Sequence, residues 1–333
     1  MNEVVKFALA VIAIVSCVSC NGSGSAAPEG PPEPEITPFE GTHGSLIDST
    51  NTGVPAGHSL TDWVSSVTVT EDWIAASNGG SRIIENRNFT GGAVLTIRTD
   101  DVTVRYCKFN GTSRILLPEA VTGILVQDCE MDGNHENRGS LQAIKNDSAA
   151  LRLLRVRIHR WPRALTVIRG NTTVENCYLH DLTCDDSGAH IENIYVAGGA
   201  QQSYLGNKIV SNAVRTDPAI VDLNISACLA LYNQGGGLPD LDTIVVEDNW
   251  IDGDSSYAMY GGAIASKTGA FAKNLIVRGN TFGRQYQRRC GLFGPITAFG
   301  DGEPGNIWEN NRWGPRGPYW ASGDPEEGDL VLP

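Results

Sequence analysis

One six-residue stretch decides the fold: Val104-Arg105-Tyr106-Cys107-Lys108-Phe109. Its six positions are, in order, an apolar residue, two variable residues, a residue that is usually Cys or Asn, one variable residue and a large apolar residue. Eight copies occur, at residues 104–109, 126–131, 153–158, 174–179, 204–209, 246–251, 277–282 and 308–313, after a degenerate copy at 84–89. Their final residues lie 20 to 42 positions apart. A fixed motif with variable spacers is typical of a solenoid whose insertions emerge on one side.

Each copy is predicted to be a short strand, because its apolar residues alternate and include many Val, Ile and Phe. Stacking in register forms a column from the fourth residues, at positions 107, 129, 156, 177, 207, 249, 280 and 311. Asn in this column is expected to bond to Asn of the next rung, about 4.8 Å away. We therefore predict an all-β fold, a single right-handed parallel β-helix over residues 43–320, with a tail at 321–333. The hand follows the general preference for right-handed crossovers.

The first 42 residues predict export. Residues 1–20 contain Lys6 and an apolar run, Phe7 to Val15, which is too short to span a bilayer and is typical of a signal peptide. Small residues before a Cys resemble a bacterial lipoprotein signal, and either Cys17 or Cys20 would then carry the lipid. An ordinary cleaved signal is the alternative. Residues 21–42 read as a Pro/Gly/Ser tether, so we expect an envelope lipoprotein or an extracellular protein that touches the membrane only through its lipid.

The formal net charge of −13 argues against nucleic acid as a partner, because nucleic-acid binding needs a basic surface. An anionic substrate would have to be met by a local basic patch.

Cysteines add two expectations. Cys184 and Cys228 lie in the two long insertions, where an exported protein either joins them in a disulfide or leaves them free. No cysteines have the paired spacing of a zinc site, so no metal ligands are assigned.

A column of ionisable residues follows the large apolar positions: Asp132, His159 and His180 stand on successive rungs. A carboxylate one rung from an imidazole orients it for proton transfer, although polar turn residues are the plainer interpretation. The adjoining segment 151–169 is strongly basic and includes Arg155 and Arg157. It indicates either a groove for an acidic polysaccharide or, for Arg157, pairing with Glu130.

A second column is expected to change from basic to aromatic along the axis: Arg98, Lys145, Arg169, Tyr195 and Tyr232. Sugar rings stack on Tyr, and sugar carboxylates face Lys or Arg.

The densest ionisable cluster follows: Asp185, Asp186, His190 and Glu192. Such a cluster binds a cation, for which Ca²⁺ is a candidate, acts as acid and base, or caps a loop.

Several segments resemble the secreted right-handed parallel β-helix repeat proteins of bacteria and phages, in the pectate-lyase-like superfamily: 51–57, 97–105, 231–233, 260–262 and 290–308. The resemblance covers roughly residues 50–315 and implies a scaffold that carries lyases, hydrolases, epimerases and non-catalytic adhesins. That family often shows His-x-Asp-Gly-Ile where this chain has His190-Ile191-Glu192-Asn193-Ile194. Leu165 stands where the second Arg of the pectate-lyase segment would be, and polygalacturonase signatures are absent.

These residues predict a carbohydrate-active protein in one of three forms. A polysaccharide lyase would neutralise a uronate carboxylate with Arg163 and Arg169 and move a proton with His159, His180 or His190. A glycoside hydrolase would use carboxylates, for which Asp185, Asp186 and Glu192 are the compact candidates. A non-catalytic protein would hold a glycan through exposed aromatic and Arg side chains.

Overall fold

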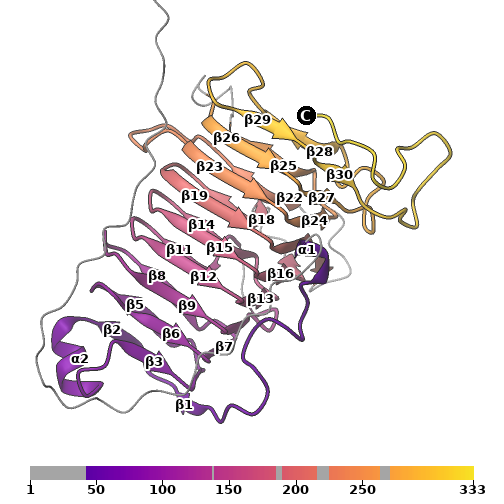
Figure 1. The fold of residues 1–333 in the computed structure, drawn as a ribbon. Coiled ribbons are helices and arrows are strands. Elements are labelled where there is room, and N and C mark those ends of the chain that lie inside the picture. Colours follow the sequence, from indigo (N-terminus) through magenta and orange to yellow (C-terminus); the bar gives the residue numbers. More distant parts are fainter. Residues whose placement is uncertain (1–42, 137–138, 185–189, 216–224, 263–270) are drawn as a thin grey trace, which may run out of the picture. The chain divides into compact units, whose positions relative to one another are not determined.

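Three parallel sheets make up the structure, a computed structural model that describes residues 43–136, 139–184, 190–215, 225–262 and 271–333. Successive strands along the chain enter the three sheets in turn, so each coil of the chain adds one strand to each sheet (Figure 1). All strand pairs within these sheets are parallel, which makes the fold a parallel β-helix. The predicted signal peptide and tether lie outside the described residues.

Sheet A contains the final residues of the sequence motif. Its strands, in spatial order, are β1 (Thr61–Trp63), β4 (Arg87–Phe89), β7 (Lys108–Asn110), β10 (Glu130–Asp132), β13 (Arg157–His159), β16 (Tyr178–His180), β20 (Lys208–Ser211), β24 (Trp250–Gly253), β27 (Thr281–Phe282) and β30 (Arg312–Trp313).

Sheet B follows sheet A in each coil. Its strands are β2 (Val67–Val69), β5 (Val94–Ile97), β8 (Arg114–Leu117), β11 (Gln142–Asn146), β14 (Arg163–Val167), β18 (Ile191–Val196), β22 (Ile225–Leu231), β25 (Tyr257–Gly261) and β28 (Gly294–Thr297). A separate pair joins β17 (Leu182–Cys184) and β21 (Ala213–Arg215).

Sheet C leads back to sheet A. Its strands are β3 (Ile83–Glu85), β6 (Thr103–Arg105), β9 (Ile124–Gln127), β12 (Leu151–Leu154), β15 (Thr172–Glu175), β19 (Ala200–Leu205), β23 (Asp242–Glu247), β26 (Lys273–Arg278) and β29 (Ile307–Glu309).

The motif is the corner between sheets C and A, not one strand as the sequence predicts. In the first full copy, Val104 lies on β6 and Phe109 on β7, and the chain turns between them. One left-handed residue makes each turn, with φ between +49° and +64°: Tyr106, Asp128, Arg155, Asn176, Gly206, Asp248, Gly279 and Asn310. Tyr and Arg rarely adopt this conformation, so neighbouring rungs impose it there.

The predicted asparagine column is confirmed. The side-chain Oδ1 of Asn249 accepts from the backbone N–H of Asn207 at 2.8 Å, and that of Asn280 accepts from Asn249 at 3.0 Å. Each Asn Nδ2 also donates to the Oδ1 of the next rung at 2.9 Å, as far as Asn311. On earlier rungs a thiol takes the same position: Cys129 Sγ lies 3.4 Å from the backbone nitrogen of Cys107. The side chains of the column therefore satisfy backbone N–H groups at the buried corner between sheets C and A.

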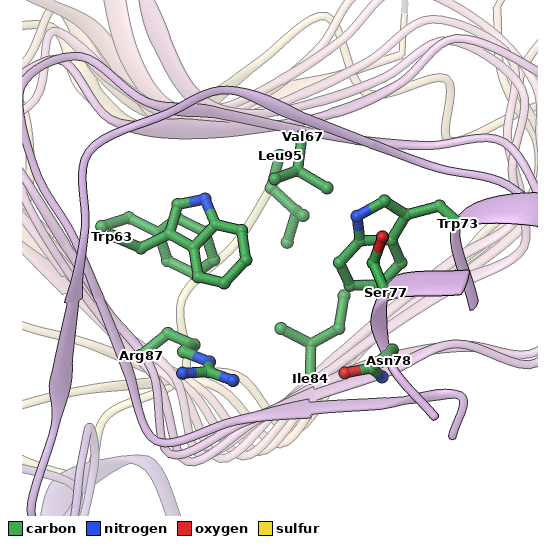
Figure 2. Close-up of a pocket in the computed structure, with 9 residues that line it drawn as sticks. Trp63, Val67, Trp73, Ser77, Asn78, Ile84, Arg87 and Leu95 are labelled. Carbon is green, nitrogen blue, oxygen red and sulfur yellow. The ribbon is translucent and has the colours of Figure 1, made fainter. Parts of the chain in front are cut away.

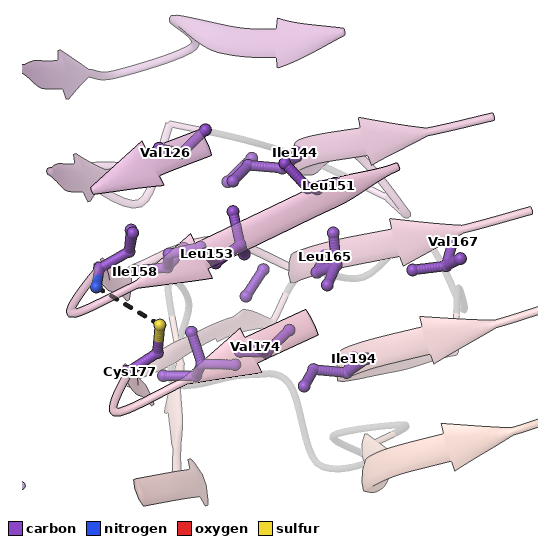
Figure 3. Packing of buried hydrophobic residues seen from close by; sticks show 14 of the residues in the cluster. Val126, Ile144, Leu151, Leu153, Ile158, Leu165, Val167, Val174, Cys177 and Ile194 are labelled. Carbon is purple, nitrogen blue, oxygen red and sulfur yellow. Dashed lines mark hydrogen bonds between the residues drawn. The ribbon is translucent and has the colours of Figure 1, made fainter. Parts of the chain in front are cut away.

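The core fills the space between the sheets. The eight large apolar residues that end the motif copies are at most 8% exposed: Phe109, Met131, Ile158, Leu179, Ile209, Ile251, Phe282 and Trp313. Figure 3 shows Val126, Leu153 and Val174 on successive strands of sheet C, facing the residues of sheet B. Burial of one such side chain contributes about 1.5 to 3 kcal/mol, and each coil buries its apolar residues only against its neighbours.

An N-terminal strap, residues 43–60, lies along the outer face of sheet A and was not expected from the sequence. It begins with α1 (His43–Leu46) beside β24, where Gly44 N–H donates to Asp248 O at 3.0 Å (Figure 1). Gly53 N–H donates to Arg155 O at 2.9 Å, several coils earlier. Gly53 has φ +84°, and a Cβ there would lie 3.3 Å from Arg157 Cβ, so glycine permits this close approach.

Both ends of the described solenoid are covered. At the first coil, α2 (Glu71–Ser77) begins at Thr70, whose Oγ1 accepts from Trp73 N–H at 3.2 Å. At the last coil, Val331 N–H donates to Asn311 O at 2.8 Å, so part of the predicted tail joins the edge of sheet A. Neither described helix is long and apolar enough to cross a membrane.

We predict that Asn280→Ala lowers the free energy of unfolding by about 2 to 4 kcal/mol, because it leaves two buried backbone groups of the preceding rung, Asn249 N–H and Val246 O, unsatisfied. Urea denaturation measures the change. The matched control is Asn171→Ala, where the exposed amide bonds only to Gln201 and the expected loss is below about 0.5 kcal/mol. Equal losses in the two variants would contradict a special role for the column.

Candidate functional site

The structure brings Asp132, His159 and His180 together in the predicted order. They occupy adjacent rungs, with Asp132 paired to His159 and His159 to His180. The two imidazole rings stack with centroids 5.1 Å apart and planes 4° apart. However, these side chains are only 7%, 4% and 6% exposed, so the column is not the accessible one that the sequence predicts. Neighbouring Arg and carboxylate side chains surround it.

Both imidazoles in this column are fully engaged. Arg160 Nε donates to His159 Nδ1 at 3.3 Å, so His159 carries its proton on Nε2, 3.0 Å from Glu130 Oε1. Arg157 Nε donates to His180 Nε2 at 3.1 Å, so His180 carries its proton on Nδ1, 2.8 Å from Asp181 Oδ2. The tautomers are opposite, and all four ring nitrogens have partners. The histidine pair therefore forms a closed hydrogen-bond network with its Arg and carboxylate neighbours.

Charges in the histidine pair are balanced locally. The hydrogen bond from His159 lowers the pKa of Glu130 to about 2, and the bond from His180 lowers that of Asp181 to about 2. Burial lowers the pKa of His180. Glu130, Asp132 and His159 lie close enough to share a metal ion. Arg160 already contacts the Asp132 carboxylate, and Lys108 and Arg157 approach Glu130 at 3.7 and 3.9 Å, so these groups supply the charge that Ca²⁺ would bring.

A second cluster on sheet B unites more of the predicted residues. Arg163 on β14 is paired with Glu192 on β18, and its Nε and Nη2 lie 3.0 and 2.5 Å from Glu192 Oε2. Arg163 Nη2 also donates to His190 O at 3.2 Å, and its guanidinium carbon lies 4.4 Å from the centre of the Tyr195 ring. Glu192 is 1% exposed, so this ion pair is buried. Asp185 and Asp186 lie outside the described residues.

His190 is the exposed histidine of this cluster. Its Nδ1 lies 2.9 Å from Ser226 Oγ, and Ser226 also hydrogen-bonds the Tyr232 hydroxyl. Among the described residues, none hydrogen-bonds its Nε2. His190 therefore differs from His159 and His180 in having a nitrogen directed to solvent. The sequence reasoning missed Ser226, because a single Ser in an insertion carries no pattern.

Five aromatic rings form a row on the outer side of sheet B, which we call the aromatic row. Ring centroids are 5.5 Å apart for Tyr195 and Tyr232, 4.9 Å for Tyr232 and Tyr260, 5.7 Å for Tyr260 and Tyr257, and 5.6 Å for Tyr257 and Phe293. The row crosses four successive strands, β18, β22, β25 and β28, or the residues next to them. It therefore runs along the solenoid axis, and it ends at Phe293, which is 64% exposed.

Burial raises the pKa of Tyr195, Tyr232 and Tyr260. These three phenols are therefore neutral at physiological pH and able both to donate and to accept a hydrogen bond.

The second predicted column is wrong in part. Register places Lys145 beside Thr166, Thr166 beside Tyr195 and Tyr195 beside Ala230. Arg98, Arg169 and Tyr232 lie outside it: Arg98 pairs with Glu119, Arg169 is exposed in the turn after β14, and Tyr232 follows the end of β22. The offsets arise because insertions of unequal length separate the motif from sheet B, so distance from the motif does not give the register there.

The predicted basic patch is largely neutralised. Arg155 binds both carboxylate oxygens of Asp128, at 2.7 and 2.9 Å, and Arg152 lies 2.6 Å from Glu175. Arg157 lies between His180 and Glu130, as one of the two interpretations anticipated. The carboxylates that pair with these Arg residues come from the neighbouring rungs. The sequence alone did not reveal this pairing.

The predicted disulfide is not formed in the structure. Cys228 is a free thiol inside the coil, with its sulfur 3.1 Å from Asp252 O, and burial raises its pKa to about 12. Its side chain points into the core rather than toward an outer loop. The side chain of Cys184 lies outside the described part, as do Cys17 and Cys20.

A small cavity lies at the opposite end of the solenoid. It occupies the first coil between Trp63 and Trp73, with Val67, Leu95 and Ile84 around it (Figure 2). Its volume is about 320 Å³, including space open to solvent. The Arg87 guanidinium lies 5.2 Å from the centre of the Trp63 ring. The residues around the cavity are those that close this end of the core.

Comparison of the chain with protein-family models, with curated proteins and with solved structures gives no significant match.

Acid is predicted to destabilise the protein through His180 and through the carboxylates Glu130 and Asp181. The unfolded state binds a proton near pH 6.5 before the buried His180 does, so this contribution is complete above about pH 6.5 and is lost as pH falls. A second loss follows as pH falls from about 4.5 toward 2, where Glu130 and Asp181 are protonated. Urea denaturation across this range measures both. His180→Gln is expected to remove the loss of stability below about pH 6.5, whereas His58→Gln, at an exposed histidine, should keep it. Identical pH profiles of stability in the two variants would refute the assignment of this loss to His180.

Asp252 gives a dependence of opposite sign. It lies on β24, two rungs beyond His180, and burial raises its pKa from 3.8 to about 6. The folded state therefore keeps a proton that the unfolded state loses, and stability falls as pH rises from about 3.8 to about 6. Asp252→Asn is expected to abolish this fall in the same denaturation series. An unchanged pH profile in the variant would show that Asp252 ionises normally.

Proposed function

We propose that the protein binds a linear glycan along the aromatic row of sheet B. The observation that carries this proposal is the row itself, five rings in contact across four successive strands, which range from Tyr232 at 8% exposed to Phe293 at 64% exposed. Parallel strands repeat about every 4.8 Å, so the row follows the solenoid axis from strand to strand, with Tyr257 and Tyr260 on the same strand. The apolar faces of sugar rings stack on aromatic rings, while neutral phenols exchange hydrogen bonds with sugar hydroxyls.

Sheet B is a better binding face than sheet A for two reasons. The N-terminal strap lies along the outer face of sheet A and packs against Arg157. The ionisable groups of sheet A also satisfy one another, as the four engaged nitrogens of His159 and His180 illustrate. A ligand on sheet A would have to displace these contacts, whereas the tyrosines of sheet B already face outward.

A second candidate function, glycan cleavage by β-elimination, is favoured by His190. Its Nε2 would take the proton next to a uronate carboxylate, the bond from the sugar to the glycosidic oxygen would break, and that oxygen would leave and be protonated. Arg163 is the nearby cation for the carboxylate, but it is already bound to Glu192. Binding therefore has the stronger support, and the hydrolase alternative rests on Asp185 and Asp186, outside the described residues.

The proposal also covers the superfamily and the cellular location of the protein. The three-sheet parallel β-helix fits the pectate-lyase-like superfamily that the sequence resembles, with its right-handed coil. We also propose export and a lipid at Cys17 or Cys20, carried by the sequence pattern of residues 1–42.

Tyr260→Ala is predicted to weaken glycan binding about tenfold, because it removes the ring that contacts both Tyr232 and Tyr257. A glycan array followed by titration calorimetry on residues 43–333 gives the dissociation constants. The matched control is Tyr319→Ala, an exposed tyrosine outside the row, which should bind like the parent. No binding to any glycan, or equal weakening in both variants, would reject the aromatic row as the binding site.

Cleavage has its own test, the ultraviolet absorbance of unsaturated uronates during incubation with polygalacturonate and alginate, with and without Ca²⁺. A lyase gives a rise that His190→Gln abolishes while leaving glycan affinity within about twofold. A flat trace with the parent protein rejects the lyase and leaves the binding proposal intact.

A further inference from the structure

We infer that the glycan held on the aromatic row is uncharged. This inference rests on the proposed function and names its ligand class, in contrast to the acidic polysaccharide that the basic segment 151–169 suggested. It follows from ion pairs that only the folded chain reveals, at the beginning of the row and along it.

The cations at the beginning of the row already have carboxylate partners. Arg163, which lies against Tyr195, is held by Glu192 through two nitrogens. Lys145, two rungs before Tyr195 in the same column, lies 2.8 Å from Asp147. A sugar carboxylate at either cation would compete with a carboxylate of the protein that is already bound there. Because Glu192 is 1% exposed, displacing it would leave an unpaired charge inside the protein, which is strongly unfavourable.

The row itself supplies no compensating charge. Its strands β18, β22, β25 and β28 contain one residue with a formal charge at neutral pH, Glu192, which is negative. The whole chain has a formal net charge of −13, so the long-range field also opposes a polyanion. A neutral sugar meets neither obstacle.

The polar groups beside the row suit hydroxyls. Tyr232 and Ser226 are neutral groups that donate and accept, and His190 lies next to them. Sugar hydroxyls match these groups because they too both donate and accept.

Two nearby cations form no ion pair with a described residue, and both lie off the row. Arg169 is exposed in the turn after β14, and Arg114 lies on β8, three strands before the β18 strand of Tyr195. If the inference were wrong, Arg169 would be the cation most available to an acidic sugar. It therefore provides a diagnostic substitution.

The decisive experiment compares two polymers with the same backbone and linkage: polygalacturonate, and the same sample after chemical reduction of its carboxylates to alcohols. Titration calorimetry on residues 43–333 is run alongside neutral glucan and mannan at about 50 and 500 mM NaCl. We expect at least one neutral polymer to bind, with a dissociation constant that changes less than about twofold with salt. Where both members of the pair bind, the reduced polymer should bind at least about tenfold more tightly than its parent.

Two variants sharpen the comparison. Glu192→Gln frees the charge of Arg163 and should raise affinity for polygalacturonate at least about fivefold, with melting temperature as the check on folding. The inference is overturned if polygalacturonate binds more tightly than every neutral polymer, with an affinity that falls with salt and that Arg169→Gln weakens. That result would leave the proposed glycan-binding function in place. Absence of binding to any polymer would overturn that function and the inference with it.

Discussion

Register between coils is the constraint on which the rest of this structure depends. At each passage from sheet C to sheet A, one left-handed residue turns the chain. In the eight motif copies the next residue, except Val156, is an Asn or Cys, and from Cys129 onward its side chain accepts a hydrogen bond from the backbone of the preceding rung. A slip by one residue would turn the apolar column outward and break this ladder at once. Because the ladder fixes register, every residue at a given motif position lies above its counterpart, and side chains distant in sequence become neighbours.

The two outer faces use this register in different ways. On sheet A, it stacks His159 on His180 and places an Arg and a carboxylate at each ring, so the polar groups satisfy one another beneath a strap. On sheet B, it places aromatic side chains in contact across successive strands. A closed polar network contributes stability, whereas the aromatic row is the surface that we propose for binding.

Ion pairing between rungs also determines how the charged residues should be interpreted. Segment 151–169 is basic when counted along the chain, yet Arg152, Arg155 and Arg163 each meet an acid from a neighbouring rung. In a solenoid the relevant neighbours are about one coil away rather than adjacent in sequence. A cluster of like charges in the sequence is therefore weak evidence for a charged ligand unless the facing rungs are known.

The sequence by itself determined the repeat, the Asn and Cys column, the apolar column and the succession of Asp132, His159 and His180, because a fixed motif carries its own register. It did not determine the second column, because insertions of unequal length separate the motif from sheet B and distance from the motif does not give the register there. Only the tertiary structure decided which cations are paired, that Cys228 is a buried free thiol, and that Ser226 supports His190. Those properties depend on contacts between coils joined by insertions of unequal length, and no local pattern encodes such contacts.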